Sequence, residues 1–298
     1  MKLCKPLFEI WEQSAGLEGV YKQIEKVGRV CYKSEDKITE DSAKPFVDRM
    51  IKSGHGAMLE HGTVYLQYET AKSAINPLTK YYLNKYSKVK AKEGAIEETM
   101  RLFVTTNLRV LVENNWLKDL EYICEPTEFH ERRVTVHFVC DRGVSHEFVR
   151  HRVMSFAQES TRYCNYSKDK FGNELTFIKP CWLDIPTGHY AYWDGDWCDI
   201  DKMKIQLPEG EHKDIDAFLW TLNNAETHYT LLINSGWKPQ EARAVLPNSL
   251  KTELVMTGFV SDWKHFFELR CDSAAHPQAR ELAIPLKEEF IKKDYITE

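Results

Sequence analysis

The sequence contains no long run of apolar residues. No stretch approaches the roughly 18 consecutive apolar residues of a membrane-spanning helix, and the first ten residues contain Lys2, Lys5 and Glu9 where a secretion signal would be apolar. The eight cysteines form no Cys-x-x-Cys pair, which excludes the usual zinc and thioredoxin-type spacings. We therefore expect a cytoplasmic protein with free thiols and no membrane partner.

Basic residues are in slight deficit. The 298 residues include 40 Lys and Arg against 45 Asp and Glu, so the net charge is -5. Affinity for nucleic acid comes mostly from neutralising phosphates, so we do not expect general binding of DNA or RNA. Any anion site must be a local group of Arg and Lys. Metal-ligand spacings such as His-Glu-x-x-His are absent, and no metal site is expected.

Apolar periodicity predicts a mixed α/β chain with more helix than strand. Hydrophobic residues make up 43% of the chain and charged residues 29%, as in soluble globular proteins. Strands are expected at Thr63–Tyr68 and Arg133–Cys140. Residues 76–128, rich in Lys and Glu, are interpreted as an inserted helical region, and residues 180–212 as a long loop. Helices are expected at about 17–27, 42–53, 97–114, from 144, at 215–232, at 239–246, and at 278–292 with a kink or break near Pro285.

The most informative segment runs from Arg142 to Arg162. It contains four arginines and two histidines but only two acidic residues. The planar guanidinium group suits phosphate, because it donates two parallel hydrogen bonds. On a helix, Arg150 and Arg152 would point about 200° apart, which favours two neighbouring ligands or one long dinucleotide over one small anion. The alternative is a solvated basic face with internal salt bridges.

The spacing within this segment is distinctive. Arg150-His151-Arg152, seven further residues, Ser160 and then Arg162-Tyr163 resemble the arginine-histidine-arginine motif of the flavin-dependent thymidylate synthases. The resemblance covers the chain except about 72–130 and 183–213, which look like insertions. Further elements that resemble the family in the same order are Gly28–Tyr32, Gly54-His55, Glu60-His61, Ala242–Pro247 and Phe267–Arg270.

This resemblance implies a fold and an activity. The fold would be one domain over residues 1–298, with a central antiparallel or mixed sheet flanked by helices and a helical insertion. The activity would be methylation of dUMP to dTMP, with 5,10-methylenetetrahydrofolate as carbon donor and NADPH-reduced FAD as hydride source. Members of the family are homotetramers with sites between subunits.

The resemblance also implies site residues. Arg270 would activate the uracil ring, because a fixed cation favours the N3-deprotonated, electron-rich form. Ser160 has no dedicated base in its motif and is assigned to binding. Cofactor contacts are expected from His55, Ala57, Glu60, Arg150, His151, Arg152, Gln158 and His265. Contacts to dUMP are expected from Arg142, Glu147, Gln158, Glu159, Ser160, Thr161, Arg162, Arg243 and Arg270.

Three positions depart from the family pattern. Phe259 and Ser261 stand where an Asn and an Arg commonly face FAD, and Ala57 stands where Ser or Thr is usual. We therefore expect the adenine end of FAD to be held differently. We hypothesise that Asn107-Leu108-Arg109 supplies replacement contacts; the alternative is that these residues only pin the insertion.

Other interpretations of single residues and of the whole chain stay open. Trp182, Trp193 and Trp197 could stack on folate or could anchor their own loop. The same arginines could serve a non-catalytic nucleotide- or RNA-binding protein. The chain could also be a flavoprotein oxidoreductase that acts on another substrate.

Overall fold

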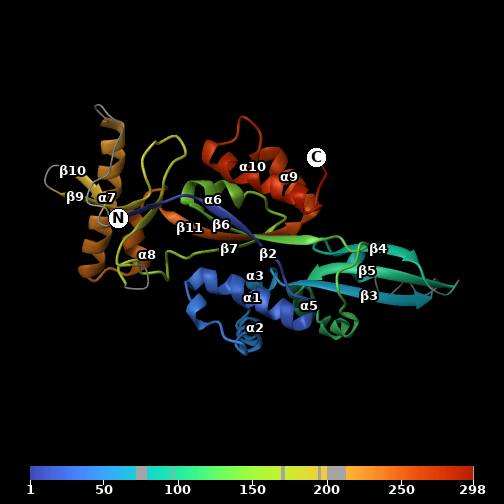
Figure 1. Cartoon of the computed structure of the whole chain (residues 1–298). Helices are drawn as coiled ribbons and strands as arrows, with labels where there is room; N and C mark the ends of the chain where they lie inside the picture. The colour runs from blue at the N-terminus through green and yellow to red at the C-terminus, as the bar shows by residue number, and fades with distance from the viewer. Residues whose placement is uncertain are drawn as a thin grey trace.

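The computed structural model describes residues 1–71, 79–94, 96, 98–168, 172–193, 196–199 and 213–297. These residues form helices and three sheets, which confirms the mixed α/β class (Figure 1). No helix of the described part has both the length and the apolar composition needed to cross a membrane. The single domain expected over the whole chain stays a prediction.

The central sheet is antiparallel and has the strand order β2-β6-β11-β7. Its strands are β2 (Leu7–Trp11), β6 (Arg133–Asp141), β11 (Lys251–Phe259) and β7 (Ser155–Gln158). Val, Thr and aromatic residues dominate β6 and β11, as is typical of strands packed on both faces. Helices lie on both sides of this sheet, as expected (Figure 1).

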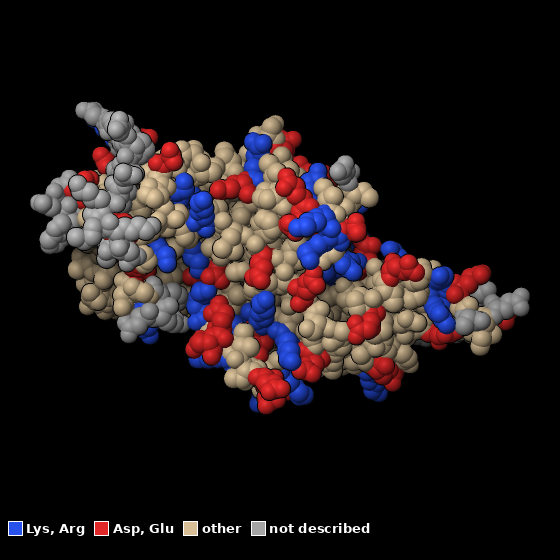
Figure 2. Space-filling model, in the orientation of Figure 1, with Lys and Arg blue, Asp and Glu red and all other residues tan. Residues whose placement is uncertain are grey.

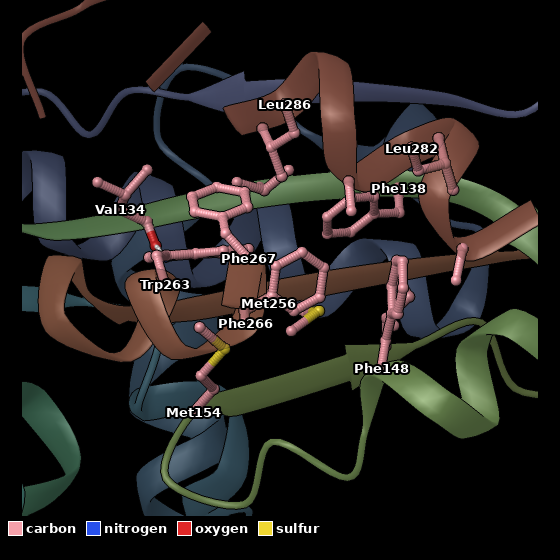
Figure 3. Packing of buried hydrophobic residues seen from close by; sticks show 14 of the residues in the cluster. Val134, Phe138, Phe148, Met154, Met256, Trp263, Phe266, Phe267, Leu282 and Leu286 are labelled. Carbon is pink, nitrogen blue, oxygen red and sulfur yellow. Dashed lines mark hydrogen bonds between the residues drawn. The ribbon is translucent and has the colours of Figure 1, made fainter. Parts of the chain in front are cut away.

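One face of the central sheet carries the main hydrophobic core (Figure 3). Alternate β6 residues, among them Val134 and Phe138, point to this face because side chains alternate along a strand. They pack against Trp263 and Phe266. The indole N–H of Trp263 donates to the carbonyl oxygen of Val134 over 3.1 Å. The helices that cover this face are α6 (Arg142–Phe148), α9 (Val260–Arg270) and α10 (Pro277–Lys292), the last of which continues through Pro285 without interruption.

The other face packs against the N-terminal helices. Val27 and Val30 lie on Ala157 and Val255 of the sheet. Close packing here depends on small residues: a Cβ atom at Gly28 would come within 2.6 Å of the Phe46 ring. The helices of this layer are α1 (Gly16–Tyr32), the short 3-10 turn Glu35–Lys37, α2 (Ala43–Lys52) and α3 (Gly56–Leu59), and the two expected helices at 17–27 and 42–53 are confirmed.

The expected helical insertion is wrong in its main part. Two strands of this region pair with the preceding strand, where the strand expected at Thr63–Tyr68 is confirmed, in an antiparallel sheet of order β3-β5-β4 at one end of the molecule (Figure 1). Its strands are β3 (Thr63–Ala71), β5 (Thr99–Asn107) and β4 (Lys88–Glu93), and the helical pieces are α4 (Thr79–Tyr82), α5 (Leu108–Glu113) and the 3-10 turn Leu117–Tyr122. The helix expected at 97–114 is therefore a strand over Thr99–Asn107, because the Thr, Val and Phe residues of β5 pair with strands on both sides.

The expected loop at 180–212 is also partly wrong. Aromatic side chains at alternate positions form β9 (Gly188–Trp193) and β10 (Asp196–Asp199), while residues 200–212 lie outside the described part. These strands extend a sheet of order β10-β9-β1-β8, in which β1 is Lys2–Cys4 and β8 is Thr176–Ile178. The apolar stripe expected at 215–232 is the helix α7 (Lys213–Asn234), followed by α8 (Pro239–Ala242) and the 3-10 turn Arg243–Val245.

Candidate functional site

The arginine-histidine-arginine motif lies in a turn between two elements of the central fold. Strand β6 leads directly into α6, whose N-terminus is capped by Asp141 through a 2.7 Å hydrogen bond from the Val144 N–H. The helix ends at Phe148, so Arg150 and Arg152 lie beyond it, in the turn that leads to β7. The helical angle expected between these two arginines therefore does not apply, and both side chains are exposed.

The structure brings Arg270, Glu147 and His151 into contact. Arg270 Nη1 donates to Glu147 Oε2 over 2.8 Å, and Arg270 Nη2 donates to the Glu147 carbonyl oxygen over 2.7 Å. Arg270 Nε donates to Nε2 of His151 over 3.1 Å. Arg270 lies 119 positions from His151 and 123 from Glu147 in the sequence, and these contacts join the C-terminal end of α9 to α6 and the turn after it.

His151 is uncharged in this arrangement. Burial first, and then the charge of Arg270 and the neighbouring His265, lower the pKa of His151 to about 4. Because Arg270 can only donate, His151 Nε2 must be the acceptor and the ring proton must sit on Nδ1. The ring of His265, another predicted cofactor residue, lies 5.9 Å from that of His151 between centroids.

A second group of predicted residues lies along the turn after β7. Arg243 Nη1 donates to Thr161 Oγ1 over 3.2 Å, and the backbone N–H of Arg162 donates to Ser160 Oγ over 3.3 Å. The Arg162 and Arg243 side chains are exposed. The turn is fixed to the first helix through the Ser160 N–H, which donates to the Cys31 carbonyl oxygen over 3.0 Å.

Glu159 and Gln158 point inward from the same segment. Lys251 Nζ and the Tyr166 hydroxyl each donate to a Glu159 carboxylate oxygen over 2.9 Å. Gln158 Nε2 donates over 2.8 Å to Ser145 Oγ of α6. Both side chains therefore hold the turn to its neighbours, and their predicted ligand contacts stay predictions.

Sequence reasoning missed the buried charges beneath this turn. Lys251 and Glu253 face the same side of β11, and Glu253 also bonds His137 over 2.9 Å and pairs with Lys33. Burial opposes both charges, yet the partners raise the pKa of Lys251 and lower the pKa of Glu253. The signal was the Lys-Thr-Glu alternation, which places two charges on one face of a strand.

Arg133 connects the remaining predicted cofactor residues to the central sheet. Its Nη1 donates to the Glu60 carbonyl oxygen over 3.0 Å and to Thr63 Oγ1 over 3.2 Å, and its Nη2 donates to Ser155 Oγ over 3.4 Å. Burial lowers the pKa of Arg133 to about 10. Sequence reasoning missed this residue, although an arginine that opens an apolar strand was a visible signal.

The Glu60 carboxylate has a separate partner. Arg109 forms ion pairs with Glu60 and with Glu113, and the Asn107 side chain caps α5 by accepting from the Val110 N–H over 3.2 Å. His55 and Ala57 lie at the start of α3 with exposed side chains. The flavin contacts hypothesised for Asn107–Arg109 stay a prediction.

His61 makes the stability of this region depend on pH. The ring is fully buried, and its Nδ1 is hydrogen-bonded to Thr257 Oγ1 over 2.8 Å. Burial, and then Arg133, lower the pKa of His61 from 6.5 to about 3. Between these values the unfolded chain binds a proton that the folded chain does not, so stability is lost as the pH falls below 6.5.

We expect a His61→Gln variant to lose less stability on acidification than the native chain. The slope of one proton is about 1.4 kcal/mol per pH unit, so the difference between the two chains should shrink by about 2 kcal/mol from pH 6.5 to pH 5. Urea unfolding at both pH values measures this quantity. Parallel pH dependence of the two chains would contradict the assignment of a buried neutral ring.

Among the hollows that adjoin these groups, two lie next to predicted ligand residues. One of about 270 Å³ has Arg152, Arg133, Lys88 and Phe259 in its lining. The other, of about 300 Å³, lies beside Glu147. Neither hollow is lined by more than one of the predicted arginines, and Figure 2 shows basic and acidic side chains interspersed over the visible face of the molecule. In one chain, the predicted ligand residues thus form separate groups.

Of the tryptophans proposed to stack on folate, one lines a hollow and another is buried. Trp182 lines the hollow beside Glu147, is mostly exposed, and meets the His276 ring edge-on with centroids 5.8 Å apart. Trp197 is buried and packs on Tyr192 and Trp220, which is the anchoring alternative. The Trp193 side chain lies outside the described part. Among the described residues, no three His, Cys, Asp or Glu side chains are arranged to hold a metal ion.

Comparison with known proteins decides the family. Residues 112–294 match the model of the thymidylate synthase complementing protein family. The chain belongs to this family. The membership expected from the arginine-histidine-arginine motif is thereby confirmed, and the matched range includes α6, the motif and α9.

Named relatives of this family member are similar over different lengths. The flavin-dependent thymidylate synthase of Pyrococcus furiosus is 31% identical over 160 residues, which are 53% of this chain and 53% of that protein. The match thus spans about half the length of this relative. The flavin-dependent thymidylate synthase of Corynebacterium aurimucosum is 22% identical over 277 residues, 92% of this chain and 77% of that protein.

A solved structure is similar over nearly the whole of this family member. The UMP/dUMP methylase PolB from Streptomyces cacaoi, bound with 5-Br dUMP, shares 18% identity at a TM-score of 0.42. The alignment covers 98% of this chain and 93% of that one.

Proposed function

We propose that this chain is a flavin-dependent thymidylate synthase. It methylates dUMP to dTMP, with 5,10-methylenetetrahydrofolate as carbon donor, FAD as cofactor and NADPH as reductant. The observation that carries the proposal is the contact among Arg270, Glu147 and His151. The motif resemblance assigns these residues to activation of uracil, to dUMP and to FAD, respectively, and the fold brings them together.

The geometry of Arg270 suits a role at the uracil ring. Three of its five N–H groups are used, by Glu147 and His151, which leaves two for a ligand. These bonds hold the guanidinium in one orientation, so its charge is fixed before substrate binds. A fixed cation beside the ring favours loss of the N3 proton, and the neutral His151 adds no competing charge.

The residues around Arg133 fit a bound flavin nucleotide. Arg133 is half-buried, its Nε is shielded from solvent and has no hydrogen-bond partner in the described part of the chain, and it forms no salt bridge there. A partly desolvated cation of this kind is stabilised by an anion nearby, such as a phosphate. When bound, FAD supplies the hydride that it receives from NADPH, while Arg152, Glu60 and His151 would position it.

We also propose that the complete site forms between subunits of a homotetramer. The Arg150, Arg162 and Arg243 side chains are exposed on a single chain. Desolvation strengthens such cations as ligands for phosphate, and a neighbouring subunit would supply it. Sedimentation of the purified protein tests the assembly, and a monomer at assay concentrations would contradict it.

An omission assay tests the activity. FAD-loaded protein is incubated with [5-³H]dUMP, methylenetetrahydrofolate and NADPH, and tritium release and dTMP are measured. We expect both products only when all three substrates are present. NADPH oxidation without dTMP would indicate another flavoprotein activity, and nucleotide binding without any turnover would indicate a binding protein.

A variant of Arg243 tests the binding of dUMP separately from the methyl transfer. We expect Arg243→Ala to raise the KM for dUMP about tenfold or more, because a hydrogen bond to a charged group contributes about 1.5–3 kcal/mol. The side chain is exposed and bonds Thr161 only through Nη1, so thermal stability should not change. Steady-state kinetics measure the effect. An unchanged KM would remove Arg243 from the dUMP site.

A further inference from the structure

The hollow of about 270 Å³ lies where the outlying three-stranded sheet meets the central sheet. Lys85, Tyr86 and Lys88 approach from the chain that leads into β4, and Asn107 ends β5. The other wall is formed by the central sheet and its connections. It consists of Arg133, Arg152, Val153, Ser155, Gly258, Phe259 and Asp262.

The lining of this hollow is strongly basic. Lys85, Lys88, Arg133 and Arg152 face a single carboxylate, that of Asp262. Asp262 Oδ2 already accepts a 2.9 Å hydrogen bond from the Phe259 N–H at the start of α9. An excess of fixed cations in a recess produces a positive potential that concentrates anions, although the chain as a whole is acidic.

The cations of the hollow are not used in ion pairs. In the described residues, none of these four side chains forms a salt bridge, whereas Arg109, Arg270 and Lys251 all do. Lys88 Nζ and the Arg133 guanidinium each lie 5.5 Å from the Phe259 ring centroid. Two cations thus flank one aromatic ring at the end of β11, and Asp262 is the one carboxylate in the lining they share.

The Arg133 side chain is the second observation that points to an anion. It is half-buried and lines the hollow, and its Nε, shielded from solvent, lacks a hydrogen-bond partner among the described residues. Its two Nη atoms donate only to uncharged oxygens, and a partly desolvated charge without a carboxylate in contact is costly. An anion in the adjoining hollow would offset this cost, and the exposed Lys85 and Lys88 would share the same charge.

We propose that Lys85 and Lys88 bind the phosphates of the flavin nucleotide in this hollow, together with Arg133 and Arg152. The inference rests on the proposed function, because it takes the anion to be part of FAD. A volume of about 270 Å³ is at the lower limit of small-molecule pockets, so the hollow takes only part of the cofactor. The lysines lie in the segment that departs from compact family members, and they would compensate for the missing arginine at Ser261.

Arg109 is the competing residue for this role. Its guanidinium is in ion pairs with Glu60 and Glu113, and it does not line the hollow. An Arg109→Ala variant therefore tests separately the hypothesis that Asn107-Leu108-Arg109 contacts FAD. The inference predicts that Arg109→Ala affects FAD affinity less than the loss of the two lysines.

The test is the affinity of the apoprotein for FAD and for ADP, measured by fluorescence quenching and by equilibrium dialysis. We expect Lys85→Ala/Lys88→Ala to raise the Kd for FAD about tenfold or more, since each lost charged contact weakens binding by that order. Lys88→Glu should have a larger effect than Lys88→Ala. Lys92→Glu is the matched control, because Lys92 lies on the same strand over the Phe129 ring and outside the hollow.

Each outcome decides the inference. If the native chain binds FAD and the double variant binds it within about twofold as well, the inference is overturned and the proposed function stands. If the native chain binds no FAD, the proposed function fails, and the affinity for ADP then tests the anion site. Binding of ADP by the native chain that the double variant loses supports this site. No binding of ADP by the native chain overturns the inference. Thermal unfolding confirms that the variants fold, and both lysines are exposed.

Discussion

An Arg270→Ala variant is expected to form dTMP at least about 100-fold more slowly than the native chain. The substitution removes the cation that stabilises negative charge on the uracil ring, and such preorganised donors contribute factors of about 10² to 10³. It also leaves the Glu147 carboxylate without its 2.8 Å partner, which adds a negative charge where the ring must become anionic. The measurement is the rate of dTMP formation with saturating dUMP and FAD.

Two further readouts separate this role from a structural one. Arg270→Lys keeps the charge but not the planar fork, so it should recover only part of the rate. The deficit of Arg270→Ala should shrink as the pH rises, because hydroxide then removes the N3 proton without help. Arg101→Ala, on β5 and paired with Glu69 on the outlying sheet, is the control. Full activity of Arg270→Ala would remove Arg270 from the reaction.

The largest expected effect on stability comes from Trp263→Ala. The indole is fully buried between Phe138, Phe266 and Phe290, and its N–H satisfies the Val134 carbonyl oxygen (Figure 3). Replacement of a buried aromatic residue by alanine costs about 3–5 kcal/mol, because the lost contacts leave a cavity. We expect a decrease of about 4 kcal/mol in the free energy of unfolding. Urea denaturation measures it.

Two other substitutions make this result interpretable. Trp263→Phe keeps most of the ring and loses the hydrogen bond, so it should cost about 1–2 kcal/mol. Trp182→Ala removes a mostly exposed ring and should cost less than about 1 kcal/mol. Equal losses for Trp263→Ala and Trp182→Ala would mean that the face of the sheet shown in Figure 3 is not the main core.

The elements predicted correctly are those with an undisturbed pattern. The stripe from Leu17 to Val27 faces one side of α1, and the alternating Val and aromatic residues of β6 face the core. Strand β5 was taken for a helix because it runs into α5 with only Asn107 as the cap between them, so a strand and a helix merged into one apolar stretch. Its true partners, β3 and β4, are pairings that no local pattern reveals.

Strand β11 was not predicted from the sequence, and the reason differs from that for β5. Lys251 and Glu253 place charges on a buried face, which contradicts the usual reading of a central strand. The structure explains them, because Glu159 and Lys33 come from other segments to pair with these charges, and His137 of β6 is hydrogen-bonded to Glu253. Such pairing between distant segments is a tertiary property.

The site was predictable only through the family motif. Arg270 and Glu147 lie 123 positions apart, and no spacing rule connects them. Arg133 is not predictable as a site residue because it belongs to no motif, although its contacts link α3 to β7. The basic hollow was not predicted for the same reason, since its lysines lie in a segment that looked like a helical insertion.

A titration of the flavin-loaded protein with dUMP tests most directly whether the arginine-bearing segment holds two ligands side by side. We expect dUMP to perturb the flavin absorbance spectrum, with saturation at equimolar dUMP and flavin, and we expect Arg243→Ala to shift the curve to higher dUMP. An unchanged spectrum, together with no dUMP retained in equilibrium dialysis, would contradict this arrangement.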